Sequence, residues 1–300
     1  MTTVGKVYLV GAGPGHPDLL TVRAVRLIQT GDVIVYDRLI QEEVLALAKP
    51  DAEHIFMGKL LGHHCSRQQD INELLVLKAK EGKTVVRLKG GDPFLFGRGG
   101  EEAEYLAEQG IAFEVVPGVS SCLSAPLSVG IPVTHRDVAS SVAIVTGHNC
   151  SGNHNRVDWQ ALSKVDTLVV LMGVHNVEHI AQELIAAGRA ADTPAAMIQM
   201  AFWPEQKIVV GTLATIAQDL QRAHIKAPAT LVVGEVVNLH EKLKQASPGD
   251  VAYEWPQSLS AVLAPVGVQS ADPGWTLREQ DQEQNLESAA LEGASTEGVL

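Results

Sequence analysis

The chain is poor in cysteine, in aromatic residues and in positive charge. Its 300 residues include three cysteines, 4% aromatic residues, and 23 Lys and Arg against 35 Asp and Glu. Cys65, Cys122 and Cys150 are widely spaced and odd in number, so they exclude a disulfide framework. The net charge of -12 argues against nucleic acid as a partner. No apolar run is long enough to cross a bilayer and no leader precedes the first hydrophobic run, so we expect a cytoplasmic protein without a membrane partner.

Histidine, a common metal ligand, is plentiful, with eleven residues. Two short tracts combine it with cysteine: 63–65 (His-His-Cys), and His148, Cys150 and His154. No second cluster with ligand spacing accompanies either tract. We therefore interpret them as polar loop residues and expect no metal.

Up to about residue 243, apolar strand-like runs alternate with glycine turns and amphipathic helical stretches, a pattern typical of an α/β protein. Strands are expected at 6–10, 33–36, 84–88, 113–116, 142–145, 167–171, 195–200, 207–210 and 231–237, and helices at 22–29, 66–80, 101–109, 120–129, 177–187 and 215–223. The turn at Pro117-Gly118 suggests two α/β domains, 1–116 and 117–245. Residues 246–300 carry nine acids against one base in a Ser-, Gly-, Pro-, Gln- and Glu-rich sequence, so we expect a disordered acidic tail.

The first expected strand runs into a glycine loop, Gly11-Ala12-Gly13-Pro14-Gly15. Glycines at the end of a strand let the backbone approach a ligand closely. A dinucleotide fingerprint would need glycine where His16 stands, which counts against a nucleotide-binding oxidoreductase. The G-x-G-x-G pattern of many methyltransferases does fit, with Asp37 at the place of a ribose-binding carboxylate. A plain strand-to-helix turn explains this loop equally well.

A second glycine-rich segment follows the strand expected at 84–88. It contains five glycines between residues 90 and 100, with Asp92 at the end of the strand. Arg98 and Glu101 are three residues apart and would share a surface if a helix begins there. This density of glycine beside Asp, Arg and Glu favours a loop that surrounds a flat ligand over a purely structural turn.

Taken in chain order, the motifs resemble those of the uroporphyrinogen-III C-methyltransferases, a branch of the tetrapyrrole methylase family. They are GAGPG at 11–15, P-x-LLT at 17–21, YDRL at 36–39, GGDPFLFGRGGEE at 90–102, VPGVSS at 116–121, GIPVTHR at 130–136, TGH at 146–148, LMG at 171–173 and TLVVGEVV at 230–237. The resemblance covers residues 6–243. It implies a two-domain α/β fold, each domain a mixed β-sheet flanked by helices, with the active site in the interdomain cleft. It further implies a homodimer of the stand-alone form, in which 1–116 supplies the substrate trough and donor loop, and 117–245 supplies donor binding and dimerisation.

The activity that the resemblance implies is a double methylation of uroporphyrinogen III. S-adenosyl-L-methionine would donate both methyl groups, leaving S-adenosyl-L-homocysteine, and the product would be precorrin-2 by way of precorrin-1. No metal is needed, because the sulfonium of the donor already activates the methyl group. Precorrin-2 would serve sirohaem, haem d1 or cobalamin synthesis. A tetrapyrrole methylase acting on a later intermediate, or a non-catalytic binding protein, is the alternative.

Site residues are carried over position by position. The resemblance implies donor contacts at Pro14, Gly90, Gly91, Asp92, Leu95, Ser120, Ser121, Met172, Ala201 and Ala229. Asp37 matches a proposed proton acceptor and Lys59 a proposed proton donor, while Arg98, Glu101, Arg136 and Met172 match residues that hold or activate the tetrapyrrole.

The eight carboxylates of such a substrate favour a basic binding surface, for which Arg38, Arg98, Arg136 and Lys59 are the candidates. Ordinary surface charge explains Arg38 equally well. Because arginine stays protonated, we expect Arg98 to anchor the substrate and not to accept its proton. One departure concerns residues 199–204, Gln-Met-Ala-Phe-Trp-Pro, where relatives more often place glycine or a small polar residue after the Gln-x pair.

Overall fold

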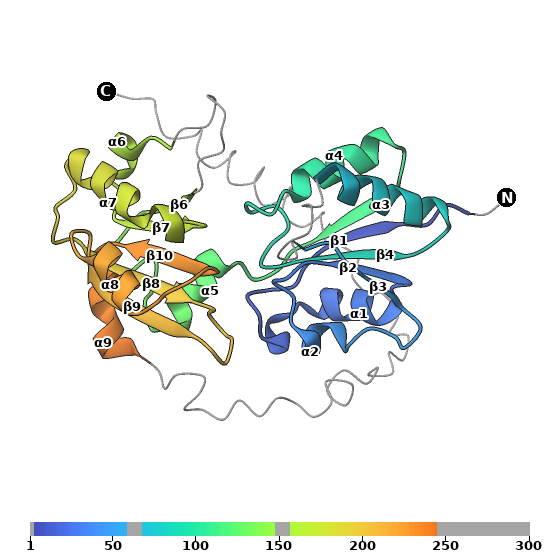
Figure 1. The fold of residues 1–300 in the computed structure, drawn as a ribbon, viewed down its shortest axis with the longest axis horizontal. Helices are drawn as coiled ribbons and strands as arrows, with labels where there is room; N and C mark the ends of the chain where they lie inside the picture. The colour runs from blue at the N-terminus through green and yellow to red at the C-terminus, as the bar shows by residue number, and fades with distance from the viewer. Residues whose placement is uncertain (1–2, 59–67, 148–156, 245–300) are drawn as a thin grey trace, which may run out of the picture. The chain divides into compact units, whose positions relative to one another are not determined.

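The computed structural model describes residues 3–58, 68–147 and 157–244 (Figure 1). Lys59, both histidine tracts and the expected acidic tail lie outside these ranges. Within them, no helix combines the length and the apolar character that spanning a membrane requires.

The first sheet is entirely parallel in its described pairings. It contains β1 (Val7–Gly11), β2 (Val33–Tyr36), β3 (Glu53–Phe56), β4 (Val85–Lys89) and β5 (Phe113–Val116), in the order β3-β2-β4-β1-β5. Helices α1 (Val22–Thr30) and α2 (Glu42–Leu45) cover one face, and α3 (Gln68–Lys80) and α4 (Gly99–Glu108) cover the other (Figure 1). A short 3-10 helix, η1 (Pro17–Leu19), precedes α1. The central strands β1, β2 and β4 are largely apolar on both faces, apart from Arg87 and Lys89 on β4, because both faces are covered.

The second sheet is mixed. Its strands are β6 (Val142–Thr146), β7 (Thr167–Leu171), β8 (Pro194–Gln199), β9 (Lys207–Thr212) and β10 (Ala229–Val233), in the order β6-β7-β10-β8-β9. Only β6 and β7 pair in parallel among its described strands. Helices α7 (Val177–Ala186) and α8 (Ile216–Arg222) share a core with one face. Helix α5 (Ser121–Ser128) and η3 (Glu235–Leu239) share a core with the other face. The remaining short helices are α6 (Trp159–Leu162), η2 (Val174–Asn176) and α9 (His240–Leu243).

The expected α/β fold of two sheets flanked by helices is confirmed. A mixed sheet was expected in each domain, and only the second sheet is mixed, because every described pairing of the first sheet is parallel. The strand expected at 231–237 ends at Val233, because Gly234 adopts a φ of 145° that a strand residue does not take. The edge strand β3 escapes sequence analysis, since its exposed Glu53 and His54 lack a strand pattern. All strands of the first sheet precede residue 117 and all of the second follow it, while the domain limits 1–116 and 117–245 stay a prediction.

Packing of α4 on the first sheet gives a test of the core. Leu106 on α4 is fully buried, whereas Leu77 on the neighbouring α3 is 55% exposed. We expect Leu106→Ala to lower the free energy of unfolding by about 2–5 kcal/mol, because it removes buried methyl groups and leaves a cavity. Leu77→Ala should change it by less than about 0.5 kcal/mol. Urea unfolding followed by circular dichroism measures both, and equal effects would contradict this packing.

Candidate active site

The candidate site begins where β1 and β4 end. These strands are neighbours in the sheet, yet β1 leads to α1 on one face and β4 to α4 on the other. In open parallel sheets, ligands bind outside the carboxyl ends of strands at such a point of divergence. Here the two loops are joined by backbone hydrogen bonds: Gly91 N donates to Gly13 O at 2.7 Å, and Gly13 N donates to Gly91 O at 3.2 Å.

A third segment, after β5, packs against the first two. A Cβ atom on Gly118 would overlap the carbonyl oxygen of Gly91 and the Cα of Gly11. A side chain at Gly11 would in turn meet the backbone of Gly118. Because the obstructing atoms are backbone, no side chain could move aside to make room. We call residues 11–15, 90–95 and 117–121 the glycine junction.

Asp92 braces this junction. Its Oδ1 accepts from Phe94 N at 2.9 Å and its Oδ2 from Gly118 N at 3.1 Å. Ser120 caps α5 through a hydrogen bond that its hydroxyl accepts from Cys122 N at 3.4 Å. Seven of the ten residues expected to contact the donor lie in this junction: Pro14, Gly90, Gly91, Asp92, Leu95, Ser120 and Ser121.

The remaining three expected donor contacts lie at one end of the strands of the second sheet, where β7 and β8 end and β10 begins. Ala229 begins β10 and pairs with Gln199 at the end of β8, while Thr230 pairs with Leu171 at the end of β7. Ala201 and Met172 follow those two strand ends. Ala201 is buried, and Met172 is 52% exposed with a positive φ of 56°.

Trp203 connects the two groups. Its indole Nε1 donates to the carbonyl oxygen of Pro14 at 3.1 Å, and a side chain at Gly15 would overlap the indole ring. Residues 199–204 depart from the family pattern, but the sequence alone indicates no partner for Trp203. The adjacent aromatic residues Phe202 and Trp203 are the sequence feature that could have indicated this contact.

Arg98 and Glu101 form the predicted surface. Arg98 is the N-cap of α4, and its Nε donates to Glu101 Oε1 at 2.9 Å. That hydrogen bond lowers the pKa of the Glu101 carboxyl. Both side chains are about half exposed, at 54% and 53%, and so are open to a ligand.

The other predicted basic residues stand apart from this pair. Arg38 follows β2, and Arg136 lies in a turn closed by the backbone of His135 and Ala139. Both are exposed, and no described contact joins either to the Arg98–Glu101 pair.

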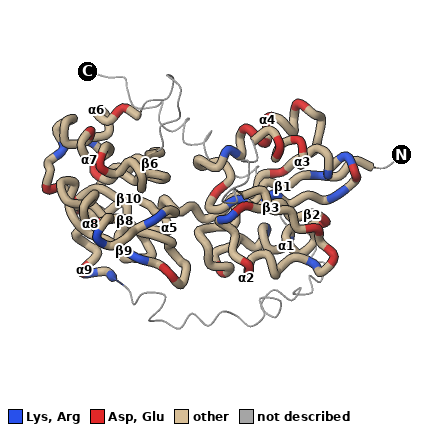
Figure 2. The backbone as a smooth tube through the Cα atoms, in the orientation of Figure 1, with Lys and Arg blue, Asp and Glu red and all other residues tan. Residues whose placement is uncertain are grey.

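Asp37 lies at the end of β2, beside a buried ionic cluster that sequence analysis missed. Its Oδ1 accepts from Leu39 N at 3.0 Å, and its Oδ2 lies 3.4 Å from Arg87 Nη2. The cluster consists of Arg87 and Lys89 on β4 and Glu102 on α4. Acidic residues recur along α4 (Figure 2), so Glu102 resembles any other helix-surface carboxylate in the sequence. The sequence feature that could have revealed this cluster is the pair of basic residues, Arg87 and Lys89, in the otherwise apolar strand β4.

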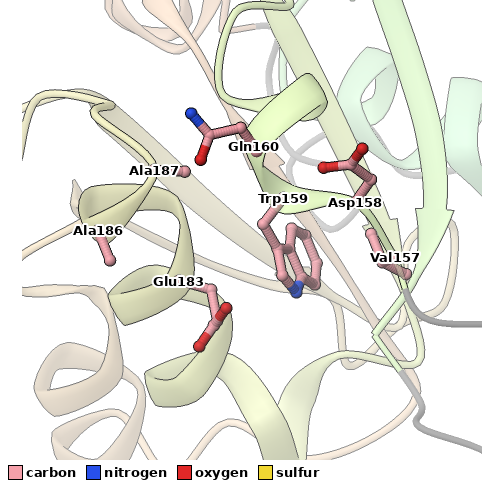
Figure 3. A pocket seen from close by; sticks show the side chains of 7 residues that line it. All are labelled: Val157, Asp158, Trp159, Gln160, Glu183, Ala186 and Ala187. Atoms are coloured by element: carbon pink, nitrogen blue, oxygen red, sulfur yellow. The ribbon is translucent and has the colours of Figure 1, made fainter.

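A separate depression of about 320 Å³ lies beside α6 and α7 (Figure 3). It is lined by Val157, Asp158, Trp159, Gln160, Glu183, Ala186 and Ala187. None of the predicted site residues lines it. Among the described residues, no group of three His, Cys, Asp or Glu side chains is placed to hold a metal ion.

The family model for tetrapyrrole (corrin/porphyrin) methylases matches residues 6–217. The chain belongs to this family. The branch expected from the motifs is also confirmed: this tetrapyrrole methylase is 50% identical to a uroporphyrinogen-III C-methyltransferase of Priestia megaterium, over 78% of the chain and 99% of the relative. It is 51% identical to an S-adenosyl-L-methionine-dependent uroporphyrinogen III methyltransferase of Methanosarcina barkeri, over 82% of the chain and 97% of the relative.

A solved structure agrees with this assignment. The crystal structure of a uroporphyrin-III C-methyltransferase from Thermus thermophilus in complex with S-adenosylhomocysteine superposes with a TM-score of 0.68. The two proteins are 42% identical, and the match covers 78% of this methylase and 94% of the other chain.

The glycine junction provides a second prediction. We expect Gly118→Ala to destabilise the methylase by about 1–3 kcal/mol, because the new methyl group overlaps backbone that is fixed by neighbouring strands. Its affinity for S-adenosylhomocysteine should fall as well, since all three junction segments must shift.

Gly100→Ala is the matched control. A Cβ at this helical position meets nothing within 4 Å, so the substitution should stabilise α4 by up to about 1 kcal/mol. Thermal unfolding and titration calorimetry measure both variants. Wild-type stability and affinity in Gly118→Ala would contradict the close packing of the junction.

Proposed function

We propose that this tetrapyrrole methylase transfers two methyl groups from S-adenosyl-L-methionine to uroporphyrinogen III, giving precorrin-2 by way of precorrin-1. The observation that carries the proposal is the 50% identity with a named uroporphyrinogen-III C-methyltransferase over 99% of that relative's length. We further propose that the enzyme acts in the cytoplasm as a homodimer and needs no metal.

Donor binding is assigned to the glycine junction and the adjacent edge of the second sheet. Backbone groups and small side chains dominate there, which suits close approach to a nucleoside and an amino-acid group. The positive end of the α5 dipole, at Ser121, favours a negatively charged group, such as the donor's carboxylate. The donor supplies a methyl group made electrophilic by its sulfonium. The protein supplies orientation, which in favourable cases lowers a barrier by about 7–11 kcal/mol.

Substrate binding is assigned to the segments that follow β2 and β4. Phe94, Phe96 and Leu39 are 59%, 41% and 38% exposed, so they offer apolar surface to a flat macrocycle. Arg98 and Arg38 lie in the same two segments and suit carboxylates at the rim of that macrocycle. Arg136 and Met172 are proposed to contact the substrate as well.

Proton removal is assigned to Asp37. A ring carbon that attacks the methyl group leaves a cationic macrocycle, which regains neutrality by losing a proton. The Asp37 side chain is 27% exposed, so it is reachable while both of its oxygens are held. Arg98 remains protonated and anchors the substrate, and Glu101 orients Arg98. Lys59, outside the described residues, is the proposed proton donor.

Arg98→Ala tests the substrate assignment. Hydrogen bonds to charged groups contribute about 1.5–3 kcal/mol, so kcat/KM for uroporphyrinogen III should fall by roughly one to two orders of magnitude. The dissociation constant for S-adenosyl-L-methionine should stay within about twofold, because the proposed partner is the tetrapyrrole. Anaerobic turnover, oxidation of the products and mass analysis give the first quantity, and calorimetry gives the second.

The control is Arg222→Ala, which breaks another exposed i,i+3 ion pair, with Asp219 on α8. It should leave both quantities unchanged. Loss of donor affinity alone in Arg98→Ala would refute the assigned role. A wild-type product that carries one methyl group or none would overturn the proposed reaction.

A further inference from the structure

Two cationic side chains are buried at the centre of the first sheet. Arg87 and Lys89 lie on β4, the middle strand, and each side chain is only 5% exposed. Because alternate residues of a strand point to the same face, both share the face of Val85, which packs under α3 and α4. A buried charge is costly unless opposite charges and hydrogen bonds compensate it. The partners of these two residues therefore require an explanation.

Glu102 is the fully buried partner. Its side chain on α4 has no exposed surface, and its Oε1 lies 2.9 Å from Lys89 Nζ and 3.5 Å from Arg87 Nε. Gln68 Nε2 donates to the same oxygen at 3.1 Å. One carboxylate balances only one of the two cations, so the cluster needs a second negative charge.

Asp37 supplies that second charge. Its Oδ2 lies 3.4 Å from Arg87 Nη2, and its own loop holds the other oxygen through Leu39 N. Parallel pairing of β2 with β4 sets this geometry, since Val35 stands opposite Arg87 and Asp37 comes two residues later. Unlike Glu102, Asp37 reaches the surface where the substrate is proposed to bind.

Arg87 is fixed well enough to orient its partner. Its Nη1 donates to the carbonyl oxygen of Leu88 at 2.9 Å, and its Nε faces Glu102. With these two sides of the planar guanidinium engaged, Nη2 remains directed at Asp37. The arrangement connects a buried carboxylate on α4 to a reachable carboxylate at the end of β2.

Lys89 makes the cluster depend on Glu102. Burial lowers the pKa of the Lys89 ammonium, and the positive charge of Arg87 lowers it further, while Glu102 acts in the opposite direction. Removing the Glu102 charge would therefore leave two buried cations facing each other.

We propose that Arg87 and Glu102 are positioning residues for the methyl transfer: Arg87 orients the Asp37 carboxylate, and Glu102 holds Arg87 in place. The inference rests on the proposed function and adds residues that the proposed function does not use. In the step concerned, a proton leaves the cationic macrocycle, its bonding electron pair stays with the ring, and the Asp37 carboxylate binds the proton.

A double-mutant cycle in the full-length enzyme tests this. Arg87→Met, Asp37→Asn and the double variant are assayed anaerobically with saturating S-adenosyl-L-methionine and uroporphyrinogen III. Arg87→Met should lower kcat at least tenfold and leave both KM values within about twofold, while Arg87→Lys regains part of the loss. In the Asp37→Asn background, Arg87→Met should change kcat by less than about twofold, because Arg87 acts through Asp37.

Glu102 is tested by the triple variant Arg87→Met/Lys89→Met/Glu102→Gln, which also covers the case that Arg87→Met fails to fold. It removes all three buried charges of the cluster, so neither Lys89 nor Glu102 is left without its partner. This variant should bind S-adenosyl-L-methionine normally and keep the low kcat of the Arg87 variant. Glu102→Gln alone should lower kcat in the wild-type background and have little effect in the Asp37→Asn background.

Arg189→Met is the structural comparator. Arg189 is a half-buried arginine that donates to the carbonyl oxygens of Val165 and Asp166, away from Asp37. Arg189→Met should change kcat by the same factor in the wild-type and in the Asp37→Asn background, because Arg189 does not act through Asp37.

The outcomes separate the two proposals. A wild-type enzyme that does not methylate uroporphyrinogen III overturns the proposed function, and this inference with it. If the wild type is active, but the fold losses in kcat from Arg87→Met and Asp37→Asn multiply in the double variant, only the inference is overturned. Full activity of Asp37→Asn would do the same.

Discussion

The mutual contact of three glycine backbones is the constraint on which the rest of the site depends. Gly11 is the last residue of β1, whereas Gly91 and Gly118 follow the neighbouring strands β4 and β5. The three approach so closely that a Cβ atom on Gly11 or Gly118 would overlap backbone. Asp92 secures the contact by accepting hydrogen bonds from two of the segments involved. The position of the Arg98–Glu101 pair and the start of α5 both follow from it, because their segments leave the sheet at this junction.

Much of the fold could be predicted from the sequence, because apolar runs bounded by turns define most strands. The limits of β5 and β7 match the expected ranges, whereas β3 was missed because an exposed edge strand carries little apolar signal. The glycine junction was predictable for a similar local reason, since glycine density is visible in the chain itself. The Arg87–Glu102 and Arg87–Asp37 pairs were not, because they join residues 15 and 50 positions apart and depend on strand register and helix orientation.

The two arginine–glutamate pairs of this region differ in what surrounds them. Arg98 and Glu101 meet at the surface, where water screens their attraction and about half of each side chain is exposed to solvent. Arg87 and Glu102 meet in the core, where little water reaches them and a lost partner leaves an uncompensated charge. The same pair of residue types therefore suits capture of an anionic molecule in one place and fixed geometry in the other.

The hydrogen bond from Trp203 to Pro14 has a consequence for how this chain can vary. It ties the connection between β8 and β9 to the loop after β1, although 189 positions separate the two residues. Connections between antiparallel strands ordinarily tolerate insertions and deletions. Here a change in length would pull the indole away from the Pro14 carbonyl, so the β8–β9 turn and the loop after β1 are expected to evolve as a matched pair.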